Sequence, residues 1–280
     1  LDLATGEITA PFPHGDAVFE VTPHGTTLLM HRQDGAWSRY LYDLNTGQEL
    51  ARLTVPGWQT DGCSILADGR RAVIAVHRCD GARYESDCVS RLYLLAAGRE
   101  PQLLDEIGGC YCNHVMACPA DPELFAYDAW PSPRYDIDQV IRVRSLDGRI
   151  DQPAALDERA PRPGNFWSVR DHYVWTPDGT RIVSYLAVEP IDMQRVPFNH
   201  FTFDWWLTAL DWRTGEDYAA QYPPGRWGGH MQVTPDSRYI LCAGGPGFDY
   251  LFAVEVDGLR RGWNERIICA YPHTVSAGTN

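Results

Sequence analysis

Lysine is absent from this 280-residue chain. All 24 basic residues are arginine and 37 residues are acidic, which gives a net charge of −13. Partners such as duplex nucleic acid or an anionic membrane surface require a basic face, so we expect neither of them. Without any ammonium side chain, an anionic ligand has to be bound by arginine, histidine, a metal ion or backbone N–H groups.

Long apolar runs are also missing. No segment approaches the roughly 18 apolar residues of a membrane-spanning helix, and no basic-then-apolar signal segment follows Leu1. Hydrophobic residues make up 44% and charged residues 22% of the chain, which is the composition of an ordinary globular protein. We therefore expect a cytoplasmic protein that has no membrane partner.

The eight cysteines do not follow the spacing of a small disulfide-rich secreted protein. Free thiols are the expectation for a cytoplasmic protein, whereas in an exported protein Cys79 and Cys88 can close a hairpin loop. A zinc site is an alternative that rests on four closely spaced residues: Cys110, Cys112, His114 and Cys118. We favour the simpler interpretation that a strand buries small cysteines on one face.

Two turn motifs recur along the chain. Thr176-Pro177-Asp178-Gly179 and Thr234-Pro235-Asp236-Ser237 are the clearest copies of the first, and a short β-rich run follows each. A polar motif that ends in glycine, such as Asp43-Leu44-Asn45-Thr46-Gly47, closes each unit and is typical of hairpin turns. Units of about 40 to 60 residues, without long helical periodicity, are typical of β-propeller blades with four short strands.

The sequence therefore predicts an all-β fold, a β-propeller with about five blades that form a single domain over residues 1–280. We expect the blades at about 18–60, 61–112, 113–167, 168–229 and 230–280. Because the sequence begins inside a blade and without methionine, we expect these blades to be part of a larger ring.

Three histidines occupy the same position in successive blades. His114, His172 and His230 each stand five residues before the proline of the turn motif, where the two earlier blades have Val18 and Gly62. This position begins the innermost strand, so the three imidazoles are predicted to face one axial pocket. A single histidine there would be a polar strand cap, but three in phase favour a shared site. Such imidazoles suit a divalent metal ion, or one of them can act as a general base.

Further candidates surround that pocket. Arg91 starts the outer part of the second blade, Arg170 lies two residues before His172, and Trp130 lies in a segment that interrupts the third blade. Aromatic rings with nearby arginines suit stacking on sugar rings, so Arg170 and Trp130 are predicted to bind substrate. No Gly-x-Ser-x-Gly elbow supports a nucleophilic serine. A glycosidase would need inward carboxylates where the histidines stand.

Several of these segments resemble the oligogalacturonate lyase family. Residues 112–122, followed by Phe125 and Trp130, resemble the central blade of that family, and residues 171–179 resemble its Gly-His-Glu-Phe-Trp segment. Residues 230–245 are similar to the next blade, and residues 267–270 resemble the strand that precedes its last metal-binding segment. The family consists of seven-bladed β-propeller polysaccharide lyases, so the resemblance implies a seven-bladed ring.

The resemblance also implies an activity, the β-elimination of digalacturonate with a manganese-type divalent ion on the substrate carboxylate. By position, His172 corresponds to a metal ligand, His114 to the general base, and Arg91 to the residue that neutralises charge beside the scissile centre. His230 corresponds to a substrate-binding residue on the same rim. The remaining metal ligands are expected beyond Asn280, so we expect a chain that is truncated at both ends and has weak or no activity as it stands.

The predicted function is therefore metal-assisted cleavage of short, acidic uronate oligosaccharides by a carbon–oxygen lyase. The proton α to a uronate carboxylate is weakly acidic, so a cation on the carboxylate and a base of near-neutral pKa are both needed. The alternative is a non-catalytic propeller of the TolB-like or peptidase-associated type that only binds a partner. The sequence leaves open which uronic acid, linkage and metal are used, and the oligomeric state.

Overall fold

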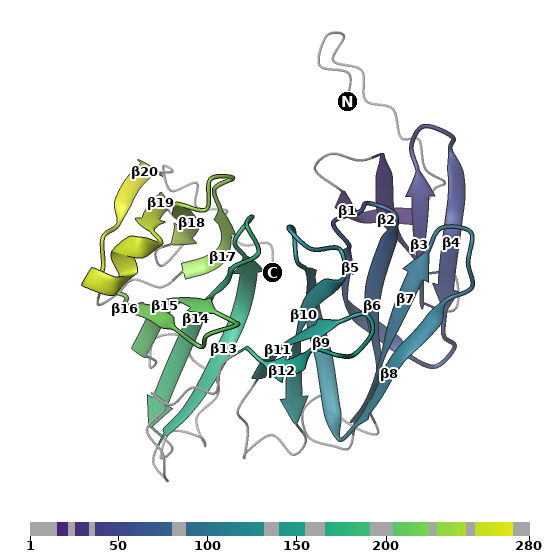
Figure 1. The fold of residues 1–280 in the computed structure, drawn as a ribbon, viewed down its shortest axis with the longest axis horizontal. Helices are drawn as coiled ribbons and strands as arrows, with labels where there is room; N and C mark the ends of the chain where they lie inside the picture. The colour runs from purple at the N-terminus through teal and green to yellow at the C-terminus, as the bar shows by residue number, and fades with distance from the viewer. Residues whose placement is uncertain are drawn as a thin grey trace, which may run out of the picture.

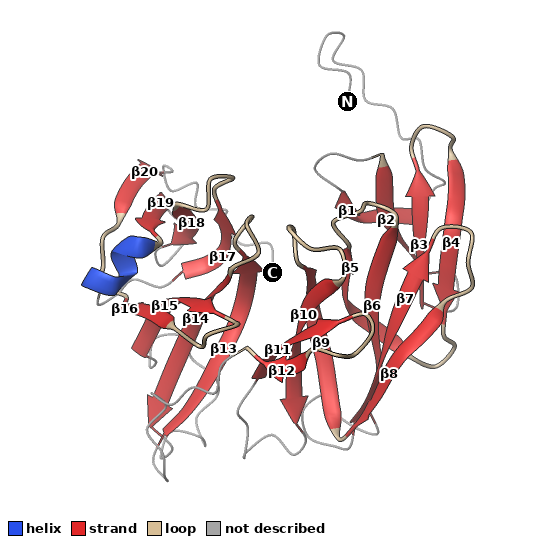
Figure 2. Ribbon diagram, in the orientation of Figure 1, coloured by secondary structure: helices blue, strands red, loops and turns tan. Residues whose placement is uncertain are grey.

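The computed structural model describes residues 16–21, 26–33, 37–79, 88–131, 140–154, 166–190, 204–223, 228–244 and 250–270. Within these residues the chain forms β-strands and a short 3₁₀ helix, η2 (Asp257–Arg261), so the fold is all-β as predicted (Figure 2). No helix in this part of the chain has the length and apolar character needed to cross a membrane.

The strands form four-stranded antiparallel sheets. The first sheet contains β1 (Asp16–Val21), β2 (Thr27–Gln33), β3 (Trp37–Asp43) and β4 (Gln48–Thr54). The second contains β5 (Gln59–Ile65), β6 (Arg71–Cys79), β7 (Cys88–Ala96) and β8 (Gln102–Gly108). The third contains β9 (Cys110–Ala117), β10 (Leu124–Pro131), β11 (Val140–Ser145) and β12 (Asp151–Pro153). The fourth contains β13 (Phe166–Trp175), β14 (Arg181–Pro190), β15 (Asp204–Asp211) and β16 (Asp217–Gln221). The fifth contains β17 (Gly228–Val233), β18 (Tyr239–Gly244), β19 (Tyr250–Glu255) and β20 (Arg266–Ala270).

In every sheet the strand order follows the sequence, so each sheet is a simple meander. The first strands of successive sheets contact one another, from β1 to β5, β5 to β9, β9 to β13 and β13 to β17. In Figure 1 the last strands of four sheets, β4, β8, β16 and β20, lie farther from the middle of the molecule than the first strands of those sheets. This is the arrangement of β-propeller blades, and each expected blade range overlaps one of these sheets. The larger seven-bladed ring stays a prediction.

The first turn motif fixes the hairpin between the first two strands of a sheet. Thr176 Oγ1 donates a hydrogen bond to Asp178 (2.6 Å), and the Thr180 N–H donates to the same carboxylate (3.0 Å). Gly179 follows with φ +67°, a left-handed conformation that glycine adopts at little cost. Because these contacts are local, the recurrence of the motif in the sequence was enough to predict the turns.

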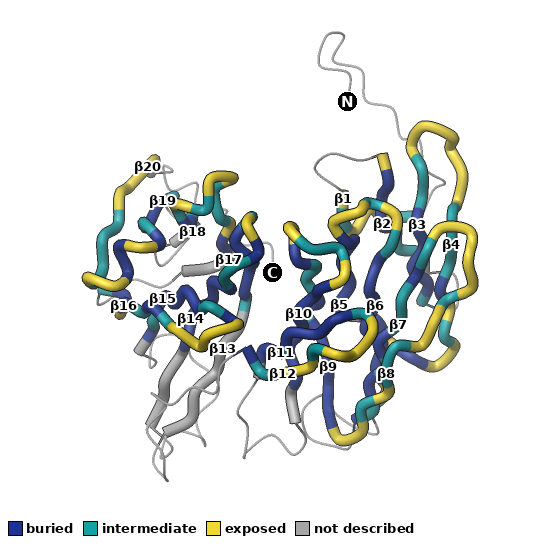
Figure 3. Tube along the Cα trace, viewed as in Figure 1, coloured by how far each residue is buried: buried dark blue, intermediate teal, exposed yellow. Residues whose placement is uncertain are grey.

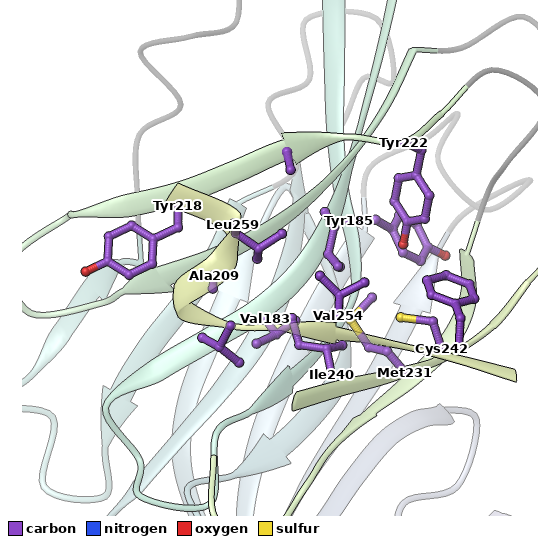
Figure 4. Packing of buried hydrophobic residues seen from close by; sticks show 14 of the residues in the cluster. Val183, Tyr185, Ala209, Tyr218, Tyr222, Met231, Ile240, Cys242, Val254 and Leu259 are labelled. Atoms are coloured by element: carbon purple, nitrogen blue, oxygen red, sulfur yellow. The ribbon is translucent and has the colours of Figure 1, made fainter. Parts of the chain in front are cut away.

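Apolar side chains hold neighbouring sheets together face to face. Leu29 and Leu41 of the first sheet pack on Ile65 and Ile74 of the second, and all four are buried. Figure 3 shows that buried segments, in dark blue, run along the strands of these sheets. Equivalent clusters fill the later interfaces, and Figure 4 shows the one between the fourth and fifth sheets. Each fully buried side chain of this size contributes about 1.5–3 kcal/mol, so the interfaces fix the position of every inner strand.

The cysteines follow two of the predicted alternatives. Cys79 and Cys88 stand opposite each other on β6 and β7 and form a disulfide, so the expectation of free thiols is wrong for this pair. Cys110, Cys112 and Cys118 form no disulfide and are buried among apolar residues, as small hydrophobic side chains. The described residues contain no group of three metal-binding side chains, which disfavours the zinc alternative. Disulfides are typical of oxidising compartments, and the cytoplasmic location stays a prediction.

Candidate active site

Two of the three in-phase histidines stand on β-bulges of neighbouring inner strands. His114 on β9 has φ +45° and His172 on β13 has φ +49°, and the register of each strand with its neighbour shifts there. Positive φ is uncommon outside glycine, and a bulge changes the direction in which a side chain points. The same backbone irregularity therefore presents both imidazoles.

The two imidazoles lie side by side across the interface between the third and fourth sheets. Their ring centroids are 5.4 Å apart and the ring planes are inclined by 43°. The side chain of His114 is 37% exposed, so a ligand can reach it. The structure thus brings together two of the residues that the sequence predicted for a shared site.

A buried carboxylate orients His114. Its Nδ1 atom lies 2.7 Å from Oδ2 of Asp128 on β10, and the Asp128 side chain has no exposed surface. A carboxylate in this position fixes the ring orientation and favours the tautomer with a proton on Nδ1. It also stabilises the positive charge that the ring acquires when it accepts a second proton. This geometry is that of a histidine general base with an orienting acid.

A tyrosine orients His172 in the corresponding way. The hydroxyl of Tyr185 on β14 and Nδ1 of His172 are hydrogen-bonded, and the two rings stack with centroids 5.2 Å apart. The indole ring of Trp205 packs edge-on against Tyr185 at 5.1 Å. The imidazole of His172 is therefore held by a buried aromatic group rather than by a charged one.

The backbone of His114 is fixed from both neighbouring blades. On one side the Tyr173 hydroxyl donates to the His114 carbonyl, and the Trp175 indole N–H donates to the Met116 carbonyl (3.1 Å). On the other side the backbone of β9 lies directly against Gly62 of β5, where a Cβ atom would come within 2.8 Å of the His114 nitrogen. Glycine at this position therefore allows the bulge of His114 to approach β5.

Three of the predicted substrate-binding residues can be placed only by their strands. His230 lies on β17, Arg170 on β13 and Trp130 on β10, while their side chains lie outside what the structure describes. The register of β17 shifts between Gly228 and Met231, so His230 also stands in a bulged stretch of an inner strand. The roles of these three residues stay predictions.

Arg91 is held away from the paired histidines. Its guanidinium binds Glu106 (Nε–Oε2 2.6 Å) and lies 4.3 Å from the ring centroid of Trp58. The preceding residue, Ser90, hydrogen-bonds to the backbone of β9 at Cys110 and Cys112. Because side chains alternate along a strand, Arg91 of β7 points to the opposite face of its sheet, toward the first blade. The structure does not bring it to His114, and its catalytic role stays a prediction.

The described residues do not by themselves fit a manganese site. They contain no group of three histidine, cysteine or acidic side chains that could hold a metal ion. Nδ1 of His114 is bound to Asp128 and Nδ1 of His172 to Tyr185, so neither of these two nitrogens is available to a metal ion. Manganese also prefers oxygen ligands over a pair of imidazoles. The divalent cofactor and its ligands beyond Asn280 stay predictions, and no chemical step below depends on them.

Sequence reasoning missed the orienting partners Asp128 and Tyr185. Both partners lie on the second strand of their sheet, and each is paired with the residue just before the histidine: Asn113 with Asp128, and Asp171 with Tyr185. This shared register position depends on the bulges at the two histidines, which the turn motifs in the sequence do not reveal.

No protein-family model and no curated protein sequence matches the chain. Several solved structures are similar to it. An oligogalacturonate lyase in complex with manganese is 16% identical with a TM-score of 0.55, over 91% of this chain and 76% of that one. A hydrazine synthase from Kuenenia stuttgartiensis is 16% identical with a TM-score of 0.56, over 90% and 73%. The β-propeller domain of the trilobed protease from Pyrococcus furiosus is 12% identical with a TM-score of 0.55, over 88% and 66%. At these identities the likeness shows the β-propeller fold alone.

Proposed function

We propose that the chain is a lyase that cleaves short uronate oligosaccharides by β-elimination, with His114 as the general base. The observation that carries the proposal is the contact between His114 and the fully buried carboxylate of Asp128. An imidazole that is partly exposed on one side and bound to a carboxylate on the other is equipped to remove a proton. Its place on an inner strand, beside a second imidazole, supports a site that binds one small substrate.

The reaction requires removal of the C5 proton, which lies α to the uronate carboxylate. His114 takes this proton at Nε2, because Nδ1 is bound to Asp128. The electron pair of the C5–H bond forms the C4=C5 double bond, and the C4–O glycosidic bond breaks with its electrons on the leaving oxygen. That oxygen takes a proton from solvent water and becomes a hydroxyl group, and His114 later returns its own proton to solvent. Asp128 stabilises the imidazolium that forms on His114.

We assign His172 to binding of the sugar unit from which His114 removes the proton. Its ring lies 5.4 Å from that of His114, a separation that lets both imidazoles contact one sugar ring. The hydrogen bond to Tyr185 keeps the ring in one orientation, and we assign a contact with the substrate carboxylate to this oriented ring. We assign it to substrate binding rather than to proton transfer, because Tyr185 is neutral and offers no charge to stabilise an imidazolium.

The substrate class rests on two further points. The segments that resemble oligogalacturonate lyases include the stretches of His114 and His172, and an oligogalacturonate lyase is among the structures with a similar fold. His114, supported by the buried carboxylate of Asp128, is a base that suits a substrate with an acidic C–H group. Uronates have such a group at C5. The proposed partner is therefore a small acidic oligosaccharide.

The test is an assay of the purified chain with digalacturonate and trigalacturonate, with and without added Mn²⁺. Elimination creates a double bond conjugated with the carboxylate, which absorbs in the ultraviolet. We expect ultraviolet absorbance to rise slowly with wild-type protein and with the surface variant Arg149→Gln, in line with the weak activity expected of this chain, and not to rise with His114→Gln.

Two outcomes would overturn the proposal. New reducing ends without ultraviolet absorbance would indicate hydrolysis. Oligosaccharide binding that is unaffected by His114→Gln, with no product under any condition, would favour the non-catalytic propeller instead.

A further inference from the structure

A buried arginine lies between the first two sheets without an acidic partner. Arg39 of β3 is 3% exposed, and its Nε and Nη1 atoms have no hydrogen-bond partner among the residues that the structure describes. Nη2 lies 3.5 Å from the carbonyl oxygen of Thr60 on β5, at the outer limit of a hydrogen bond. The nearby carboxylate of Asp16 is bound to Arg32 (2.6 Å), and no ion pair within the described residues includes Arg39.

A bound anion would stabilise the buried guanidinium group of Arg39. A guanidinium group stays protonated in proteins, so Arg39 cannot avoid its buried charge by losing a proton. A buried charge without a counter-charge, and buried N–H groups without acceptors, both destabilise a fold. An anion placed between the two sheets would remove both costs.

Further hydrogen-bonding groups lie around the guanidinium. His31 of β2 is directly paired with Arg39, so the two side chains lie on the same face of the sheet. The buried Nε2 atom of His31 and the buried Oγ1 atom of Thr60 also have no hydrogen-bond partner. Burial and the charge of Arg39 lower the pKa of His31, which favours the neutral form of this ring. The cluster therefore carries a single positive charge, which suits a monoanion.

Aromatic rings form the walls around this charge. The guanidinium carbon of Arg39 lies 5.1 Å from the ring centroid of Phe19 and 5.9 Å from that of Trp37. Trp37 in turn stacks on His31 with centroids 4.5 Å apart. Apolar walls favour an anion with an apolar body over phosphate or sulfate, and the two oxygens of a carboxylate match the geometry of a guanidinium.

We infer that the interface between the first two sheets holds a binding site for a small monocarboxylate. Arg39 binds the negative charge, His31 and Thr60 complete the hydrogen bonds, and Phe19 and Trp37 cover the apolar part. The site is separate from the pair of imidazoles on β9 and β13, and its existence does not depend on the proposed lyase activity.

Thermal unfolding of the full chain in sodium acetate tests this inference. A ligand that binds only the folded state raises the melting temperature. We expect acetate to raise it by several degrees over sodium chloride at equal ionic strength, once acetate exceeds its Kd about 100-fold. Neutral acetamide, which has a similar shape, should give no rise.

Variants assign the effect to Arg39. Arg39→Met should abolish the response to acetate and should be at least as stable as wild type without acetate, because it removes an unpaired buried charge. Arg52→Met is the matched control, since Arg52 lies on the adjacent strand β4 and binds Glu49 instead. Arg52→Met and His114→Gln should both keep the full response to acetate.

The inference is wrong if acetate and chloride act alike on wild type, if Arg39→Met still responds to acetate, or if inorganic phosphate gives a larger rise than acetate. Should Arg39→Met fail to fold, saturation-transfer NMR of the acetate methyl group on Thr60→Val decides instead. The signal seen with wild type should fall several-fold in Thr60→Val, and an unchanged signal would refute the site.

Discussion

The Nδ1 atom of His114 lies 2.7 Å from an oxygen of Asp128, a carboxylate with no exposed surface. A buried carboxylate is retained in a fold only where its charge is balanced by hydrogen bonds or by a positive partner. The partner here is a ring that projects from a bulge toward solvent. Asp128 is therefore placed to support the proton transfer that we propose for His114.

Asp128→Asn should lower kcat at least about 100-fold on digalacturonate, since an amide cannot stabilise the imidazolium. The substitution keeps size and shape, so the melting temperature should stay close to that of wild type. Initial rates and thermal unfolding on the same preparations check both points. Activity within about three-fold of wild type would remove Asp128 from the mechanism.

Tyr185→Phe should weaken substrate binding through His172. The change removes the hydroxyl that bonds to Nδ1 and keeps the ring that packs on Trp205. We expect KM to rise about 10-fold with a smaller change in kcat, because one oriented hydrogen bond to a charged group is worth about 1.5–3 kcal/mol. Tyr218→Phe in the same sheet is the control and should leave KM unchanged. A fall in kcat alone would instead assign His172 to the proton transfer.

Gly62→Ala should displace the bulge that carries His114. The added Cβ atom would lie 2.8–2.9 Å from backbone atoms of residues 113–115, and backbone cannot rotate away as a side chain can. We expect a loss of about 1–3 kcal/mol in stability from overpacking and a loss of at least about 10-fold in activity. Gly108→Ala is the matched control, because nothing lies within 4 Å of a Cβ atom there. Equal effects of the two substitutions would contradict the role assigned to Gly62.

Glu20 should make the stability of the first blade interface depend on pH. Burial raises the pKa of Glu20 from 4.5 to about 7, although the Ile65 N–H (2.7 Å) and the Ser64 hydroxyl (3.1 Å) both donate to its carboxylate. A raised carboxyl pKa means that the folded state holds the proton more tightly than the unfolded state does. The contribution of Glu20 to stability is therefore full below pH 4.5 and is lost as the pH rises through 7.

Denaturant unfolding from pH 5 to 8 checks this dependence. Glu20→Gln mimics the protonated form, so its stability relative to wild type should rise across this range by up to roughly 3 kcal/mol. The exposed Glu123→Gln is the control and should show no such trend. A constant difference between Glu20→Gln and wild type would show that Glu20 does not titrate in this range.

Most of the fold could be predicted because its signals are local. The turn at residues 176–179 is stabilised by contacts within a few residues, and the spacing between such turns gives the blades. The phase of His114 and His172 relative to those turns was enough to place both on inner strands of adjacent sheets. The sequence also showed Gly62 at the equivalent position, although not the close approach of β9 that requires glycine there.

The partners of the site residues could not be predicted from spacing. Asp128 and Tyr185 meet the histidines through strand pairing and bulges, which shift the register by an amount that no turn motif reveals. The resemblance to the lyase family implied that Arg91 lies beside the scissile centre, but the direction of its side chain depends on the alternation of side chains along β7. The burial of Arg39 without an acidic partner could not be predicted from the sequence either, because it results from the packing of two sheets.

The most direct test of the central claim is chemical rescue of His114→Ala by imidazole, followed through ultraviolet absorbance with digalacturonate as substrate. If His114 is the general base, the variant should be inactive on its own, and its rate should rise in proportion to the concentration of imidazole base. Imidazole should not rescue Asp128→Asn. In that variant the His114 ring is still present and occupies the space that added imidazole would need. A His114→Ala variant that keeps wild-type activity without imidazole would contradict the assignment.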